Sequence, residues 1–308
     1  MEKVQICKQV YPGKLGRAKG YRYWFSRRNF SICKFNDPPS FINVVKVSLL
    51  RKILPDFLRV PAIIFLRKTG ISTWFQNKLY AREAAALKKN FSPTLPSDFT
   101  SKMKVLIVCA HYNHTEFLPG CVSSILSQTH TNWHLLIADD KSTDPDTTSV
   151  LQAQSKRDPR IDCIKLNENS GAYTARNTGV YASQTIDWTH VTFIDPDDVA
   201  HPTWLQHSLD VLAGREGSVR PYIRRYDITL KKPLQAYFGH CPSLHSRFAW
   251  ERSGGFLSLR RSGDSELTLR LSHLSKDGLT VNVKSFEESI MCRHIPGSAT
   301  HQDLTSRK

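Results

Sequence analysis

The segment WHLLIADDKSTD, residues 133–144, is an apolar run that ends in two aspartates and a polar turn. A short continuous apolar run of this kind is typical of a strand that is buried on both faces of a sheet. Three further segments have the same character: KVLIVCA (104–110), RIDCIKLN (160–167) and WTHVTFID (188–195).

Helix-like segments lie between these four runs. Apolar residues recur at helical spacing from Phe117 to Leu126, TTSVLQAQSKR (147–157) follows the second run, and ENSGAYTARNTGVYAS (168–183) opens with a glycine turn. Strands that alternate with helices predict a parallel sheet with right-handed crossovers. The sequence therefore predicts an α/β domain, Rossmann-related, with a mostly parallel sheet and helices on both faces.

Polar residues gather where the predicted strands end. Sheets of this class bind ligands outside the carboxyl ends of their strands. We therefore expect a binding site there. Its candidate residues are His111, Tyr112, Asp139, Asp140, Asp195, Asp197 and Asp198.

Three of these carboxylates stand within the run FIDPDDVAHP, residues 193–202. Clustered carboxylates repel one another unless a cation neutralises them, and their hard oxygens suit Mg²⁺ or Mn²⁺. Because Mg²⁺ commonly joins one or two carboxylates to substrate phosphates, the run indicates a metal and diphosphate site. For this run taken alone, a solvated acidic turn remains the alternative.

Three segments in this order, VLIVCAHYNHTEFLPGCVSSILSQTHTNWHLLIADDKSTD, NSGAYTARNTGVYAS and VTFIDPDDVAHPTWL, resemble the family 2 glycosyltransferases of GT-A fold. Many members of that family build bacterial surface polysaccharides. The similarity covers roughly residues 103–300, and we expect the catalytic domain to span 103–308. The first strand departs from the usual Pro-x-Tyr-Asn ending, since Ala110 stands where the family has proline.

The resemblance implies roles on the donor side. The nucleotide would lie against the first two strand ends, with Asp140 on the base, and Asp195 of the Asp-x-Asp element would touch the ribose. Asp197 and Asp198 would hold Mn²⁺ or Mg²⁺ on the diphosphate, with Asp197 the preferred ligand. The implied nucleotide-binding residues are His111, Tyr112, Asn113, Asp139, Asp140, Arg176, Asn177 and Asp195.

The acceptor side is implied by WERSGGFLSLRRSGDSELTLRL, residues 250–271. There Gly255 and Phe256 form the acceptor turn, Asp264 falls at the catalytic base, and Glu266 is the second acidic candidate. Asp264 has a competing interpretation as a helix N-cap. Relatives often carry glutamate where this chain has Gly263. The run MCRHIPGSATH (291–301) resembles a loop over the donor phosphates and suggests His294 as a further metal-site residue.

The resemblance implies an inverting glycosyltransferase that moves a sugar from a nucleotide-diphosphate sugar to a hydroxyl of a saccharide or lipid-linked acceptor. Two other functions remain open. A sugar-phosphate nucleotidyltransferase would also use a metal and a diphosphate, although no Gly-rich phosphate loop follows the first strand. A non-catalytic basic protein could retain a degenerate transferase domain, although all the acidic candidates are present.

The net charge of +16 is concentrated in the first third of the chain. Residues 1–102 hold 20 Lys or Arg and five Asp or Glu, whereas residues 103–308 hold 23 and 22. We therefore expect a basic, mainly helical extension over 1–90, including a helix over 71–89, and a linker over 91–102. Its helices could pack on the main domain or bind an anionic membrane surface. Nucleic-acid binding is not expected, because no recognition motif accompanies the charge.

The seven cysteines are scattered, without a CxxC pair, and indicate reduced thiols rather than a disulfide framework or zinc site. The first twenty residues lack the apolar core of a signal peptide. The longest apolar stretch, residues 57–66, is too short for a membrane span. We therefore expect a cytoplasmic protein, peripheral on the inner face of a membrane if the basic extension binds lipid.

Overall fold

The structure, a computed structural model, describes residues 71–89, 97–259 and 261–295. Its contacts divide the chain into two units, Met1–Lys78 and Leu79–Lys308. Helix α4 (Ile71–Lys89) confirms the helix that was predicted over the same residues. The rest of the predicted extension, residues 1–70 and 90, and residues 91–96 of the predicted linker lie outside the described residues.

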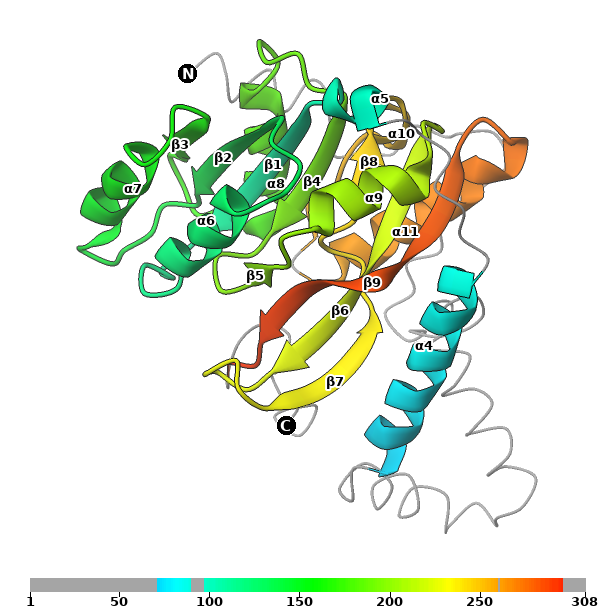
Figure 1. Ribbon diagram of the computed structural model, residues 1–308. Coiled ribbons are helices and arrows are strands. Elements are labelled where there is room, and N and C mark those ends of the chain that lie inside the picture. The colour runs from blue at the N-terminus through cyan, green and yellow to red at the C-terminus, as the bar shows by residue number, and fades with distance from the viewer. Residues whose placement is uncertain (1–70, 90–96, 260, 296–308) are drawn as a thin grey trace, which may run out of the picture. The chain divides into compact units, whose positions relative to one another are not determined.

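Four parallel strands form the half of the sheet that the sequence predicted (Figure 1). They are β1 (Val105–His111), β2 (Trp133–Asp139), β3 (Ile161–Lys165) and β4 (His190–Ile194), in the order β3-β2-β1-β4. All seven residues of β1 are buried, as its continuous apolar sequence requires. Their carboxyl ends meet at one edge, where the acidic candidates follow β2 and β4.

The other half of the sheet is mixed. Strand β8 (Leu244–Ser246) joins β4 to β6 (Gly217–Tyr226) through antiparallel pairs, and β7 (Pro233–Phe238) pairs antiparallel with β6. The long strand β9 (Val281–Arg293) runs parallel to β6 and pairs antiparallel with the short β5 (Val199–Ala200). This half was not among the predicted strands, and it brings residues near 225 and 293 beside the end of β4.

Helices cover both faces of the sheet, as predicted. Alternate residues of β1 point to opposite faces, so Ile107 lies in one apolar cluster and Leu106 in the other. The first cluster receives α6 (Leu118–Leu126), α7 (Thr147–Ser155) and α9 (Trp204–Leu212). The second receives α8 (Ala172–Ala182), α10 (Arg247–Ser253) and α11 (Gly263–Leu274). Two short helices, α5 (Ser97–Ser101) and the 3₁₀ helix η2 (Ser275–Asp277), complete the described elements.

Two glycines determine where α8 lies. Gly171, at φ 88°, has the left-handed backbone that starts the helix. Gly179 faces β1 so closely that an added Cβ would lie 2.5 Å from Val108 Cγ1. Because α8 can approach β1 this closely, its Arg176 is buried beside the end of β4.

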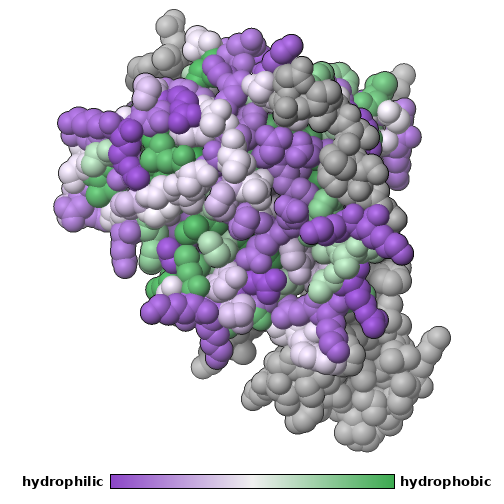
Figure 2. All heavy atoms as spheres, viewed as in Figure 1, coloured by the Kyte–Doolittle hydropathy of each residue, from purple (hydrophilic) through white to green (hydrophobic). Residues whose placement is uncertain are grey.

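Hydrophilic residues cover most of the face seen in Figure 2, with apolar residues in small groups between them. None of the helices in the described ranges is both long and apolar enough to cross a membrane. The cysteines at 109, 121, 163, 241 and 292 are free thiols. Cys7 and Cys33 lie outside the described residues.

Candidate active site

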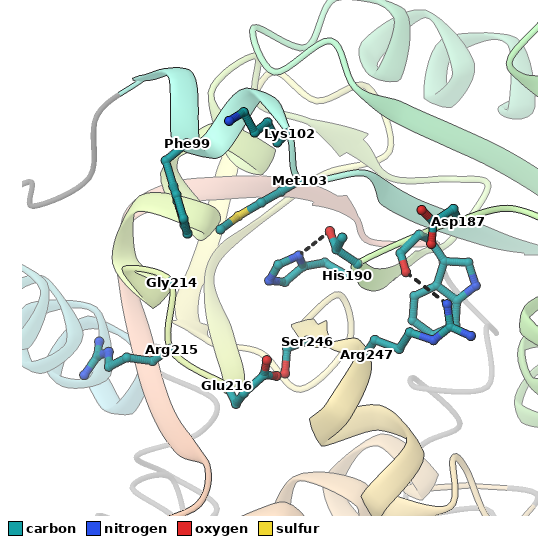
Figure 3. A pocket seen from close by; sticks show the side chains of 12 residues that line it. Phe99, Lys102, Met103, Asp187, His190, Gly214, Arg215, Glu216, Ser246 and Arg247 are labelled. Carbon is teal, nitrogen blue, oxygen red and sulfur yellow. Dashed lines mark hydrogen bonds between the residues drawn. The ribbon is translucent and has the colours of Figure 1, made fainter.

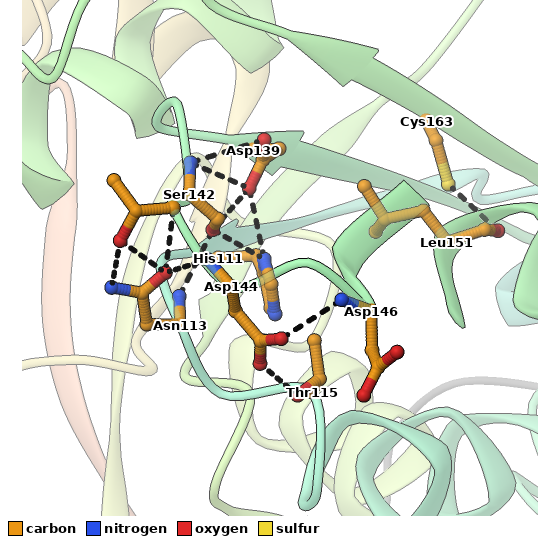
Figure 4. A network of polar contacts seen from close by, with 10 residues as sticks. His111, Asn113, Thr115, Asp139, Ser142, Asp144, Asp146, Leu151 and Cys163 are labelled. Carbon is orange, nitrogen blue, oxygen red and sulfur yellow. Dashed lines mark hydrogen bonds and ion pairs between the residues drawn. The ribbon is translucent and has the colours of Figure 1, made fainter. Parts of the chain in front are cut away.

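A buried polar network joins the ends of β1 and β2 (Figure 4). His111 and Asp139 are register partners, both side chains are fully buried, and His111 Nδ1 lies 3.0 Å from Asp139 Oδ1. Ser142 Oγ donates to the same carboxylate oxygen at 2.5 Å, and the Ser142 N–H adds a contact at 3.3 Å to Oδ2. His111 Nε2 has no hydrogen-bond partner among the described residues. Asp139 therefore uses its oxygens to order the loop after β2.

Asn113 ties the loops after these two strands together. It has a left-handed backbone at φ 54°, which asparagine tolerates better than most residues. Its Oδ1 accepts from the N–H groups of Thr143 at 2.8 Å and Asp144 at 3.1 Å. Thr115 donates to Asp144, and this hydrogen bond lowers the pKa of the Asp144 carboxyl. Tyr112, beside Asn113, is 41% exposed, so its side chain is open to a ligand.

Asp140 anchors the start of α8. Its Oδ1 accepts from the Ser170 N–H at 2.8 Å, and its Oδ2 accepts from the Gly171 N–H at 2.7 Å. Burial raises the pKa of Asp140, while the two hydrogen bonds act to lower it. The carboxylate that the resemblance places on the nucleotide base thus already binds the main chain through both oxygens.

Arg176 orients the first carboxylate of the Asp-x-Asp element. The guanidinium is almost fully buried, and its Nη2 donates to Asp195 Oδ1 in an ion pair. The Asp195 side chain keeps 45% of its surface exposed. A buried guanidinium needs such a partner, because an unpaired charge in the interior is costly. Arg176 therefore fixes Asp195 at the edge of the site.

Asp197 and Asp198 are not neutralised in the same way. Burial raises the pKa of Asp197 and, more strongly, that of Asp198, and repulsion from the neighbouring aspartates adds to both shifts. Asp198 Oδ2 accepts a hydrogen bond from Cys292 Sγ at 3.2 Å, and Asp197 Oδ1 lies 4.0 Å from His114 Nδ1. A bound cation would relieve the repulsion within this acidic cluster, which comprises Asp195, Asp197 and Asp198.

Two arginines that sequence reasoning missed also act on the acidic cluster. Burial dominates the pKa of Asp198 and of Asp197, but the charge of Arg225 acts to lower the first and that of Arg293 the second. The Nε of each arginine is buried without a hydrogen-bond partner among the described residues. No motif marks them. They arrive through the pairing of β6 with β9, in which Arg225 opposes Cys292.

The candidate base Asp264 lies in the first turn of α11. The N-cap of that helix is Ser262, so the alternative interpretation of Asp264 as the cap is wrong. The Tyr173 hydroxyl donates to Asp264 Oδ1 at 3.0 Å. The second acidic candidate, Glu266, binds Arg270 through both oxygens, at 2.9 and 2.6 Å.

Asn177 and the Gly-Gly-Phe turn join α8 to the acceptor-side segment. The Asn177 amide donates to the Phe256 carbonyl at 2.8 Å and accepts from its N–H at 3.0 Å. Phe256 is buried, with its ring 4.9 Å from that of Phe193. Gly255 has φ 75°, and its N–H donates to Ser253 Oγ. The Asn177 side chain thus bonds to the main chain of Phe256 through both its oxygen and its nitrogen, and these hydrogen bonds hold the Gly-Gly-Phe turn in place.

His294 follows the end of β9, where its N–H donates to the Tyr226 carbonyl at 2.8 Å. The remainder of the predicted phosphate loop, residues 296–301, lies outside the described residues. The role of His294 at the metal site stays a prediction.

Comparison with known proteins decides the family. Residues 106–263, more than half of the chain, match the family described as Glycosyl transferase family 2. The chain belongs to glycosyltransferase family 2. This match covers the strand ends, the acidic cluster and the chain up to Gly263, the residue before the candidate base.

Relatives of this family 2 glycosyltransferase include two bacterial proteins. TuaG of Bacillus subtilis (strain 168), whose name places it in teichuronic acid biosynthesis, is 36% identical over 114 residues, or 37% of this chain and 44% of TuaG. The Escherichia coli protein WfgD, "UDP-Glc:alpha-D-GlcNAc-diphosphoundecaprenol beta-1,3-glucosyltransferase", is 34% identical over 108 residues, or 35% and 38%. The matched part thus spans less than half the length of either relative.

Solved structures support the GT-A fold of this family 2 glycosyltransferase. The mannosyltransferase PcManGT from Pyrobaculum calidifontis, solved with GDP-Man and Mn²⁺, aligns with a TM-score of 0.51 at 16% identity, over 75% of this chain and 68% of that chain. S. aureus TarS 1-349, solved with UDP-GlcNAc, also gives 0.51 at 15% identity, over 63% and 60%. At these identities the likeness concerns the fold.

The carboxylates of this glycosyltransferase fit a divalent cation. Within the described part of the chain, no group of three or more His, Cys, Asp or Glu side chains could hold a metal ion alone. Mg²⁺, however, is commonly held by one or two carboxylates together with substrate phosphates. Arg176 forms an ion pair with Asp195. Asp197 is part-exposed, and the one basic side chain paired with it among the described residues is that of His114, at 4.0 Å. The hard oxygens of Asp197 and the adjacent Asp198 therefore suit Mn²⁺ or Mg²⁺ on a diphosphate.

A separate pocket of about 460 Å³ lies at the other end of the parallel strands (Figure 3). Met103, just before β1, and His190, the first residue of β4, line it together with Arg247 at the start of α10. The predicted site residues follow the opposite ends of these strands. This pocket is therefore distinct from the candidate active site of the glycosyltransferase.

Proposed function

We propose that this family 2 enzyme transfers a sugar from a nucleotide-diphosphate sugar to a hydroxyl group of a saccharide or lipid-linked acceptor in cell-surface polysaccharide synthesis, with inversion at the anomeric carbon. The family match favours this function over a sugar-phosphate nucleotidyltransferase and over a non-catalytic protein. The names of TuaG and WfgD support the class of product and acceptor.

One observation carries the proposal: the acidic cluster and the candidate base meet around Arg176. The guanidinium pairs with Asp195 and lies 5.4 Å from the ring of Tyr173, whose hydroxyl holds Asp264. Groups suited to a donor diphosphate and a group suited to deprotonating an acceptor thus share one edge of the sheet. This arrangement fits a displacement between two bound substrates.

The reaction follows from these positions. Asp264 takes the proton of the acceptor hydroxyl while its oxygen attacks the anomeric carbon. The bond from that carbon to the diphosphate oxygen breaks, and the nucleoside diphosphate leaves with the electron pair. A bound Mn²⁺ or Mg²⁺ supplies Lewis-acid stabilisation of the leaving group, and Asp197 and Asp198, with His294 as a further candidate, would hold it. Arg225 and Arg293 add positive charge near the same carboxylates.

Asp264→Asn tests the assignment of the base. With UDP-glucose, Mn²⁺ and a GlcNAc-diphospholipid acceptor, we expect the transfer rate to fall about 10²- to 10⁴-fold, because general base catalysis contributes that much. Glu251→Gln, on α10, is the matched control, since that carboxylate is exposed and pairs with Arg247. Full transfer by Asp264→Asn, or a product that retains the donor configuration, would overturn the proposed mechanism.

We also propose that the basic N-terminal extension binds the anionic inner surface of a membrane and so brings a cytoplasmic enzyme to its acceptor. Deletion of residues 1–70 is the suitable test. It spares Tyr80 and Glu83 of α4, which contact Phe238 and Lys284 in the catalytic unit. We expect sedimentation with phosphatidylglycerol vesicles to be lost. Unchanged binding by a folded protein would contradict this role.

A further inference from the structure

Tyr173 connects the donor-side helix α8 to the candidate base. It stands in the first turn of α8, and its hydroxyl donates to Asp264 Oδ1 at 3.0 Å although the two residues are 91 positions apart. Its ring lies 5.2 Å from that of Phe256, and Arg176 lies 5.4 Å from the ring centre. Because its ring is packed on a buried residue, the hydroxyl is held in place.

Gly263 faces the same ring. A Cβ added to Gly263 would lie 2.8 Å from both Cδ2 and Cε2 of Tyr173. Gly263 is buried and is not among the glycines with positive φ. Its backbone therefore does not require glycine, whereas the neighbouring ring leaves no room for a side chain. The ring therefore fills the space that the first atom of any side chain at position 263 would occupy.

We propose that Tyr173 is a positioning residue for the base Asp264, and that Gly263 lacks a side chain in order to admit the tyrosine ring. This inference rests on the proposed role of Asp264. The hydroxyl fixes Oδ1 and stabilises the ionised carboxylate, so that Oδ2 takes the proton from the acceptor. The tyrosine and the glycine are a matched pair that orients the base.

Tyr173→Phe removes only the hydroxyl and is the first test. With the substrates named above, we expect kcat to fall about 10-fold or more, because a hydrogen bond to a charged group is lost, while KM for UDP-glucose stays unchanged. Tyr181→Phe, on the same helix, should leave both quantities unchanged.

The second test measures the coupling between Tyr173 and Gly263. In the wild type, Gly263→Ala should lower Tm by about 2–4 °C, because the new methyl group overpacks the ring. In a Tyr173→Ala background the same change should leave Tm unchanged or raise it, since the ring is gone and alanine reduces the entropy of the unfolded chain. If the effect of Gly263→Ala on Tm depends on the residue at position 173 in this way, the two residues are coupled, as residues in contact are.

The outcomes separate this inference from the function on which it rests. An inactive Asp264→Asn together with an unaltered kcat in Tyr173→Phe would overturn the positioning role and leave the proposed function standing. If Gly263→Ala lowered Tm equally in the wild type and in the Tyr173→Ala background, the proposal that Gly263 makes room for the Tyr173 ring would be overturned. Full transfer by Asp264→Asn would overturn the assignment of the base and this inference with it, whereas a wild-type protein that transfers no sugar would contradict the proposed function itself.

Discussion

Two groups of aspartates at the same edge of the sheet are treated differently by their surroundings. Asp139 and Asp140, at the end of β2, accept hydrogen bonds from the protein through all four oxygens. In the acidic cluster after β4, Asp195 has Arg176, but burial and repulsion raise the pKa of both Asp197 and Asp198. The oxygens of Asp139 and Asp140 are all bonded within the protein, whereas the nearby charges of Arg225 and Arg293 do not offset the burial and repulsion that raise the pKa of Asp198 and Asp197.

We propose that this difference separates structural aspartates from ligand-binding ones. Buried polar groups in native proteins are nearly all paired, so a group left without compensation needs an explanation. Around Asp139 and Asp140 the hydrogen bonds order the loops and start α8. Around Asp197 and Asp198 the carboxylates, together with the Nε atoms of Arg225 and Arg293 that lack a partner among the described residues, fit a metal and a diphosphate. We therefore expect substitutions in the first group to act on stability and substitutions in the second to act on binding.

The largest effect should come from Asp197→Asn. We expect the affinity for UDP-glucose in the presence of Mn²⁺ to fall about 100-fold, because an oxygen ligand that neutralises the cation is lost. Isothermal titration calorimetry gives the dissociation constant. Asp162→Asn, an exposed carboxylate on β3, is the control and should bind as the wild type does. If Asp197→Asn and Asp162→Asn bound UDP-glucose with equal affinity, the proposed difference between the acidic cluster and the aspartates of β2 would be contradicted.

Asp139→Asn should act on stability. The amide nitrogen would replace one acceptor oxygen, so a buried donor on Ser142 or His111 would lose its partner. We expect the free energy of unfolding to fall by about 2 kcal/mol, as measured in urea. A loss of UDP-glucose affinity without a loss of stability would place Asp139 in the ligand site instead.

Asp198→Asn should raise the free energy of unfolding, whereas Asp139→Asn should lower it. Removing this buried charge relieves the repulsion from Asp197 and Asp195, and the amide still offers an oxygen to Cys292 Sγ. We expect the metal-free protein to gain about 1 kcal/mol of unfolding free energy at pH 7.5, since functional sites often sacrifice stability. Destabilisation of the size expected for Asp139→Asn would show that the cluster is compensated within the protein.

The stabilisation by Asp198→Asn should depend on pH. The folded-state pKa of Asp198 is raised above its unfolded value, first by burial, so the wild type loses stability as pH rises through that folded-state pKa. Below the unfolded pKa of about 3.9 the carboxyl is neutral in both states and the difference from asparagine disappears. Thermal unfolding of both proteins between pH 4 and pH 8 measures this. A constant difference over that range would contradict it.

The half of the fold that the sequence predicted contains the strands that are buried almost throughout, β1, β2 and β4, together with the part-exposed β3. Continuous apolar runs marked β1, β2 and β4, and helical spacing marked α4 to its last residue. Strands β6 and β9 were missed because they include part-exposed residues and carry charges. These two segments form strands because they pair with each other across about sixty residues of chain, and local sequence patterns hold no information about such pairing.

The sequence predicted which candidate residues lie at strand ends, but not the contacts that their side chains make. Aspartates at strand ends were found because strand ends converge in a parallel sheet. That Asp140 binds the loop before α8, or that Asn177 binds the main chain of Phe256, follows from tertiary packing. Arg225 and Arg293 have no motif and reach the site through the pairing of β6 with β9. Tyr173 lies within NSGAYTARNTGVYAS, but its contact with Asp264, 91 positions away, cannot be read from that segment.

The central claim is that the acidic cluster binds an activated sugar through a divalent ion. Calorimetric titration of the full-length protein with nucleotide sugars (UDP-, GDP-, CMP- and dTDP-linked), with and without Mn²⁺, tests it most directly. We expect saturable heat for at least one nucleotide sugar that depends on Mn²⁺ and is lost in Asp197→Asn. A folded protein that gives no binding heat with any of them, in Mn²⁺ or in Mg²⁺, would contradict the claim.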